Sequence, residues 1–216
     1  MTTTTLDAAA AGSERSWTRL LAPIGGLGIV GGLIALLLSP AGDDAGETPA
    51  EVVAYAASHD GWSAAGSIFG LLVLLLGGLF VAGLHARLRA SLTPTESTLV
   101  LAGGIVFMLG LAFALLLWTT PLLDIPDETA RGLVAAEAYL TVDDFGWFLF
   151  GAAGVGAALM AVPASLAALR SASVPAWLGW LGVALGVASL APVAFFGMIA
   201  WLLWIAGASV LLAAKG

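Results

Sequence analysis

The segment Ala176–Ala214, AWLGWLGVALGVASLAPVAFFGMIAWLLWIAGASVLLAA, runs for about 39 residues without a charged side chain. A single helix of that length would extend nearly 60 Å, about twice the roughly 30 Å hydrocarbon core of a bilayer. The segment must therefore fold back. Pro192 and Gly197 lie at its midpoint and are its strongest helix breakers. The pattern predicts two short spans, at about residues 177–191 and 195–212.

Four further apolar segments precede this one, and each has roughly the 20 residues that a membrane crossing needs. They cover about residues 20–38, 62–84, 99–119 and 145–169. Over the whole chain 60% of residues are hydrophobic and 10% are charged, whereas soluble domains carry about 25% charged residues. The sequence predicts an all-α polytopic membrane bundle of six transmembrane helices, arranged as three hairpins, with the lipid bilayer as its main partner.

The basic residues predict the orientation, because Lys and Arg concentrate in cytoplasmic loops. With a cytoplasmic amino terminus, only Arg131 of the seven basic residues falls outside. The other six are Arg15, Arg19, Arg87, Arg89, Arg170 and Lys215. We therefore predict a multi-pass protein of the plasma membrane with both termini in the cytoplasm.

The amino-terminal region admits two interpretations. Residues 1–16 are polar and lack apolar periodicity, which predicts a disordered cytoplasmic tail before a single transmembrane domain at 17–216. An apolar run followed by Ser39-Pro40-Ala41 also fits a signal peptide with its cleavage site. However, Leu20–Leu38 is about 19 residues long and exceeds the roughly 7–15 of a signal-peptide core. This length favours an uncleaved anchor.

Two short helices are expected in the outer loops, which together hold eleven of the fourteen acidic residues. One helix opens at Thr48-Pro49-Ala50-Glu51, where proline suits the first helical position and Thr48 with Glu51 forms a capping box. The other opens at Ile125-Pro126-Asp127-Glu128.

Seven polar residues of these loops are candidates for binding a ligand or partner on an acidic outer face. They are Glu51, His59, Asp60, Asp127, Glu128, Asp143 and Asp144. If the two loop helices pack together, the carboxylates could hold a divalent cation or a basic ligand, since hard cations take oxygen ligands. The alternative is a solvated acidic face that keeps the loops in water. No calcium-loop spacing is present, so we assign no metal ligands.

Several classes of chemistry are disfavoured. The chain has no cysteine, which excludes disulfides and thiolate chemistry. His59 and His85 lie at opposite ends of one span and cannot share a haem or metal ion. No ionisable side chain occupies the middle of a predicted span, as coupled transport or intramembrane hydrolysis would require. We expect no catalytic residue, no cofactor and, with a net charge of −7, no nucleic-acid partner.

Small residues spaced by four positions predict close helix packing. Three such pairs occur, Gly28 with Gly32, Gly66 with Gly70, and Gly182 with Gly186. These faces could join copies of the chain, or this chain to another membrane protein. The favoured alternative is packing within the chain's own bundle. The serines and threonines of the spans are expected to form hydrogen bonds between helices.

Three motifs carry a resemblance to a known group of proteins. They are Val174-Pro175-Ala176-Trp177-Leu178-Gly179-Trp180-Leu181-Gly182, Ala54-Tyr55-Ala56-Ala57-Ser58-His59 and Leu84-His85-Ala86-Arg87-Leu88-Arg89. With these motifs the chain resembles small actinobacterial-type membrane proteins that form a domain-of-unknown-function family. The resemblance implies about six helices in a bacterial membrane, and it implies no activity and no catalytic residue.

Three functions follow as hypotheses, and the least favoured is an intramembrane enzyme on lipid substrates, which would need His85 or an outer carboxylate as its base. The leading one is a non-enzymatic accessory or interaction subunit that recognises a partner through its acidic extracytoplasmic face. The alternative is a small uncoupled transporter or channel for neutral or apolar solutes, because spans rich in small residues leave room for a path.

Overall fold

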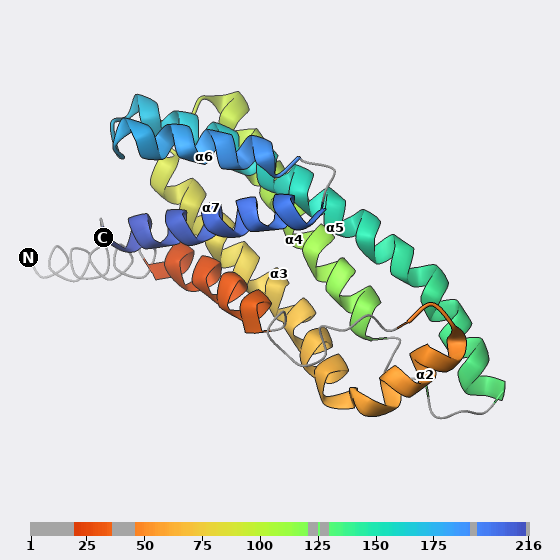
Figure 1. Cartoon of the computed structure of the whole chain (residues 1–216). Coiled ribbons are helices and arrows are strands. Elements are labelled where there is room, and N and C mark those ends of the chain that lie inside the picture. The colour runs from red at the N-terminus through yellow and green to blue at the C-terminus, as the bar shows by residue number, and fades with distance from the viewer. Residues whose placement is uncertain (1–19, 36–45, 121–124, 126–129, 191–193, 215–216) are drawn as a thin grey trace, which may run out of the picture.

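The computed structural model describes residues 20–35, 46–120, 125, 130–190 and 194–214, and every regular element in these ranges is an α-helix (Figure 1). The all-α prediction is confirmed for these residues. The elements are a helix at Leu20–Ala35, α2 at Pro49–Ser58, α3 at Asp60–Leu88, α4 at Pro94–Thr119, α5 at Ala130–Arg170, α6 at Ala176–Ala188 and α7 at Ala194–Ala214.

Among these helices, α3, α4, α5 and α7 are long and apolar enough to cross a bilayer. The 13 residues of α6 extend about 20 Å, which is less than the roughly 30 Å of a hydrocarbon core. The Leu20–Ala35 helix is also apolar and shorter than the other four. Four apolar helices of this length are consistent with an integral membrane protein.

The carboxy-terminal segment breaks where the sequence predicts it. Helix α6 ends at Ala188 and α7 begins at Ala194. Pro192 lies outside the described residues. Gly197 lies inside α7, so its assignment as a breaker was wrong. A glycine flanked by long apolar side chains costs a helix only about 1 kcal/mol relative to alanine, which is too little to end it.

One of the two expected outer-loop helices is a separate element, and the other is not. α2 ends at Ser58, where the Ser58 hydroxyl donates to the carbonyls of Ala54 and Tyr55 and competes with helical bonding. By contrast, α5 continues unbroken over 41 residues, from the loop region through the predicted fourth span. No glycine or proline occurs between Leu133 and Phe145 to interrupt it.

The core of the bundle is aromatic as well as aliphatic. Phe107 of α4 meets Trp201 of α7 edge to face, with ring centroids 5.2 Å apart, and Phe150 of α5 lies 6.1 Å from the same indole. Trp201 is 1% exposed and Trp204 is 6% exposed. These two tryptophans therefore pack inside the protein rather than at a membrane interface.

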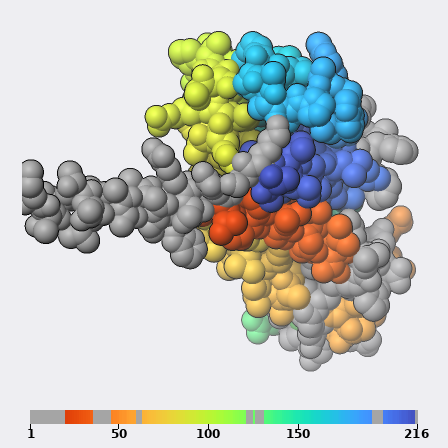
Figure 2. Space-filling view, turned by 90° about the vertical axis from the view of Figure 1, so that its left-hand side faces the viewer, coloured from red at the N-terminus to blue at the C-terminus, as the bar shows by residue number. Residues whose placement is uncertain are grey.

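The Leu20–Ala35 helix and α6 lie on either side of α7, as Figures 1 and 2 both show. Small residues allow the close approach on one side. A Cβ at Gly26 would overlap Ser209 Oγ of α7, and one at Gly25 would overlap the Leu76 carbonyl oxygen of α3. The amino-terminal helix thus packs closely against both neighbours, with Gly25 against the backbone of α3 and Gly26 against a side chain of α7.

All three Gly-xxx-Gly pairs face other helices of the same chain. A Cβ at Gly28, Gly32, Gly66, Gly70, Gly182 or Gly186 would lie within 3.1 Å of a residue on a different helix. Their neighbours are, in that order, Leu76, Phe69, Thr119, Leu116, Ser165 and Val162. A homo-oligomer through these faces would have to displace contacts that the single chain already makes.

The interface between α4 and α5 provides the first test. A Cβ at Gly156 would overlap the Phe107 amide nitrogen and lie 2.7 Å from the Gly103 carbonyl oxygen, whereas one at Gly151 would meet nothing within 4 Å. We expect Gly156→Ala to destabilise the protein by about 1–3 kcal/mol, because α4 and α5 must separate. Gly151→Ala, on the same helix, should be neutral or stabilising by up to about 1 kcal/mol. Unfolding midpoints in detergent measure both, and equal midpoints would contradict this packing.

Candidate functional site

A helical cap covers one end of the bundle. We define the helical cap as α2 together with residues 130–144 of α5. Its two helices enclose a separate buried apolar cluster, which consists of Val52, Val53, Ala56, Ile125, Ala136 and Tyr139. The Tyr139 hydroxyl donates to the Trp118 carbonyl at 3.4 Å, next to the last residue of α4. The cap is therefore packed internally and attached to the bundle.

Glu51, a predicted binding residue, serves as a capping residue. Its carboxylate accepts from the amides of Thr48 and Glu47, both at 3.0 Å, and the Thr48 hydroxyl accepts from the Glu51 amide. The predicted capping box is confirmed. The hydrogen bond from the Thr48 side chain, followed by those from the two backbone amides, lowers the pKa of Glu51 below its usual value. The carboxylate is exposed but already holds the start of α2.

His59, at the junction of α2 and α3, is held by local contacts. Its ring stacks on Tyr55 with centroids 4.2 Å apart, and Nδ1 lies 2.9 Å from the Tyr55 carbonyl oxygen and 2.8 Å from Ser58 Oγ. A carbonyl can only accept, so the contact with Tyr55 requires a proton on Nδ1. The half-buried imidazole helps to shape the bend between the two helices.

The remaining predicted residues do not form one cluster in the part of the chain that the structure describes. Asp60 is the first residue of α3. Asp127 and Glu128 lie outside the described residues. Asp143 is half-buried and Asp144 is exposed, both on α5. Within the described ranges, no three His, Asp or Glu side chains are grouped so that they could hold a metal ion.

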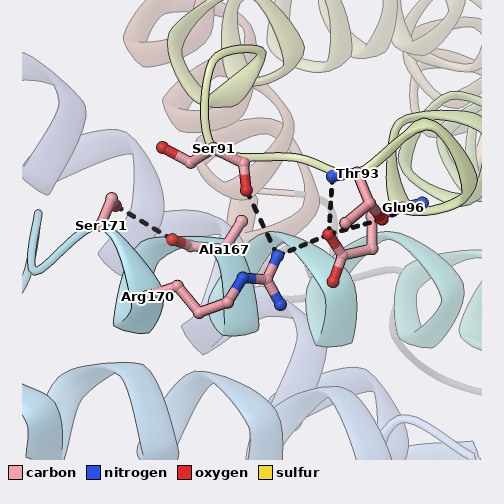
Figure 3. Close-up of polar contacts among 6 residues, drawn as sticks. All are labelled: Ser91, Thr93, Glu96, Ala167, Arg170 and Ser171. Atoms are coloured by element: carbon pink, nitrogen blue, oxygen red, sulfur yellow. Dashed lines mark hydrogen bonds and ion pairs between the residues drawn. The ribbon is translucent and has the colours of Figure 1, made fainter.

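The opposite end of the bundle is tied by an ion pair (Figure 3). Arg170, the last residue of α5, pairs with Glu96 in the first turn of α4 and donates to the Ser91 carbonyl at 3.3 Å. The Glu96 carboxylate also accepts from the Thr93 amide and hydroxyl, each at 2.9 Å, and completes a capping box. These contacts fix the turn between α3 and α4 against the end of α5.

Two more contacts hold this end together. His85 Nε2 of α3 lies 2.7 Å from Ser97 Oγ of α4, and Arg87 donates to the Leu212 carbonyl of α7 at 3.1 Å. Arg87, Arg89 and Arg170 therefore occupy the end opposite the helical cap, whereas Arg131 lies in the cap. Three of the arginines that the sequence assigns to one side of the membrane therefore lie at one end of the bundle.

Polar side chains inside the bundle bond between helices. Ser67 Oγ of α3 lies 2.9 Å from Thr119 Oγ1 and 3.1 Å from Thr120 Oγ1 at the end of α4. The Trp204 indole donates to Ser165 Oγ at 3.1 Å and joins α7 to α5. Interhelical hydrogen bonding, which the sequence predicts for the serines and threonines of the spans, is confirmed for these residues. It is not observed for Ser63 and Ser209, whose buried hydroxyls have no partner among the described residues, or for Ser189, which donates to the Leu185 carbonyl four residues earlier.

No known protein family, curated protein or solved structure matches this chain.

A cavity of about 230 Å³ lies between α3, α5, α6 and α7, near the end of the bundle that holds Arg87 and Arg170. This cavity could not be predicted from the sequence, because its walls come from four segments far apart in the chain. The capping box at Thr93-Pro94-Thr95-Glu96 was also missed, although this stretch has the same Thr-Pro-x-Glu pattern as residues 48–51. That pattern was an available signal.

A double-mutant cycle tests the ion pair. The Arg170 side chain is 49% exposed and the Glu96 side chain 16% exposed, so the coupling should be about 0.2–1 kcal/mol. Glu96→Gln alone should lower the stability by more, about 0.5–2 kcal/mol, because it also weakens the capping box at the amino-terminal end of α4. Arg170→Gln and the double variant complete the cycle in detergent unfolding experiments. Asp144→Asn is the control and should change stability by less than about 0.5 kcal/mol. Strictly additive effects of the two substitutions would contradict the pairing.

Proposed function

We propose that all six apolar helices cross the plasma membrane, with both termini in the cytoplasm and the helical cap outside. The position of the basic residues supports this orientation, because Arg87, Arg89 and Arg170 share one end and the positive-inside rule assigns that end to the cytoplasm. The two shorter helices pack against longer ones, and a bilayer adapts to short spans by local thinning.

Within this arrangement, the protein is a non-enzymatic accessory or assembly subunit that binds a partner protein through the helical cap. The observation that carries this proposal is the length of α5. Its 41 residues extend about 62 Å, roughly twice a hydrocarbon core, so about half of the helix projects beyond the membrane. A projecting helix braced by α2 forms a rigid platform that needs little ordering when a partner binds.

The exposed surface of the cap suggests the chemistry of the partner. Val134 is 67% exposed and Leu133 is 39% exposed. In the proposed orientation both lie outside the membrane, where water is the solvent. Glu137 lies one turn from Val134 on the same helical face and is also exposed. An apolar centre beside a carboxylate fits a partner with an apolar patch and a basic rim.

The spans themselves support a binding role. Some of their hydroxyls bond between helices, as Ser67 does with Thr119. No ionisable side chain occurs in the sequence between residues 61 and 84, 97 and 119, 145 and 169, or 194 and 214, which cover the apolar parts of the four long helices. Coupled transport and intramembrane hydrolysis both depend on such side chains.

Photo-crosslinking in cells tests the proposal. A photoreactive amino acid at Val134 should form an adduct with one discrete protein, and Glu137→Lys should abolish that adduct by reversing the charge beside it. The same probe at Ile105, which is 51% exposed on the apolar face of α4, should react with lipid and serves as the control. Lipid adducts alone at Val134, or a protein adduct unaffected by Glu137→Lys, would contradict the proposed interaction.

A further inference from the structure

The cavity at the basic end of the bundle has an apolar interior. Its walls are built mainly from aliphatic side chains of four helices, among them Leu84, Leu88, Ala168, Leu178, Leu185 and Leu211. Its volume of about 230 Å³ is below the roughly 300–1,000 Å³ of pockets that enclose a whole drug-sized ligand. The cavity therefore suits part of a larger apolar molecule.

Apart from Arg87, the polar side chains in its walls already form hydrogen bonds with other protein groups. Trp204 Nε1 donates to Ser165 Oγ at 3.1 Å, and Ser173 Oγ donates to the Ala168 carbonyl at 3.2 Å. A polar solute that entered would lose its water and gain few hydrogen bonds, which costs free energy. The interior thus selects for hydrocarbon over a neutral polar solute.

The rim indicates access from the lipid. Leu181 and Leu203, which line the cavity, are 45% and 57% exposed. Trp177 and Trp180, at the start of α6, are 67% and 62% exposed. Indoles favour the level of the lipid headgroups, so the cavity begins at that level and extends toward the hydrocarbon.

Arg87 adds a charge at this rim. It lines the cavity and is exposed, and its guanidinium donates one hydrogen bond to the Leu212 carbonyl at 3.1 Å. A guanidinium has five N–H donors in a planar fork that matches phosphate oxygens. The Glu96 carboxylate, at the same end of the bundle, is paired with Arg170. Arg87 therefore has donors to offer an anion.

We propose that this cavity binds an anionic phospholipid of the inner leaflet, with one acyl chain between α3, α5, α6 and α7 and the phosphate on Arg87. Apolar walls account for the chain, and the charge of Arg87 accounts for the anionic headgroup. A free phosphate would leave the apolar cavity unfilled, and a lipid with an uncharged headgroup would leave the Arg87 guanidinium without an anionic partner.

Gly207 allows the cavity to be filled selectively. It lines the cavity on α7, and a Cβ at this position would meet nothing within 4 Å. Gly207→Leu should therefore occupy the space of the acyl chain without a clash at the backbone. Gly151 is a matched control, because a Cβ there also meets nothing within 4 Å and the residue does not line the cavity.

Native mass spectrometry of the full-length, delipidated protein in detergent provides the test. The probes are phosphatidylglycerol, phosphatidylcholine with the same acyl chains, and glycerophosphoglycerol, which is the headgroup without chains. The wild type should bind one phosphatidylglycerol about fivefold more tightly than phosphatidylcholine, the gain expected from one cation. Arg87→Gln should remove this preference by weakening phosphatidylglycerol more than phosphatidylcholine, because the choline cation of phosphatidylcholine already offsets the charge of its own phosphate.

Gly207→Leu should weaken both lipids by more than about tenfold, since it displaces at least two methylene groups of the chain. Gly151→Leu should bind as the wild type does. Gly207→Met is the second filling variant if Gly207→Leu unfolds. Undiminished lipid binding by a folded filling variant, or displacement of the lipid by glycerophosphoglycerol alone, would overturn the proposal and indicate adsorption on the basic surface.

Discussion

Each long helix of this protein must satisfy its backbone hydrogen bonds without help from water. In hydrocarbon each amide and carbonyl needs an internal partner, and a helix supplies it for all residues except those at its ends. The side-chain caps accordingly occur at helix ends, as at Thr48 and Thr93. Between the ends, helices approach through small residues such as Gly103 and Gly156, where backbone meets backbone. The helical structure and the side-chain caps follow from this constraint, whereas the charged residues lie at the helix ends because a charge in hydrocarbon is costly.

The two ends of the bundle differ in construction, and in the proposed account each has a separate role. The cap end carries a projecting α5 braced by α2 over a small apolar cluster. The basic end is closed by the pair of Arg170 with Glu96, and beside it lies the apolar cavity under Arg87. A rigid cap suits a protein partner, whereas an apolar cavity with one cation suits a lipid. In the proposed account, lipid binding and partner binding occur on opposite sides of the membrane.

The sequence predicted those features that depend on neighbouring residues. Apolar runs located the helices, and Thr48 with Glu51 marked the start of α2. Features that depend on distant residues were not predictable: the cavity needs Leu84 beside Leu211, and the ion pair needs Arg170 beside Glu96. The continuity of α5 was missed because a change from polar to apolar residues does not end a helix that lacks a breaker. Six membrane crossings, the acidic ligand site and the family resemblance stay predictions.

Substituted-cysteine labelling tests the central claim most directly, since the chain has no cysteine and each introduced thiol is unique. Ala57 in the cap, Ala90 after α3 and Ser171 after α5 are all exposed. With a membrane-impermeant maleimide, Ala57→Cys should be labelled in intact cells, and Ala90→Cys and Ser171→Cys only after permeabilisation. Labelling of Ala90→Cys and Ser171→Cys from opposite sides, or of all three from the outside, would contradict a bundle whose basic end faces the cytoplasm.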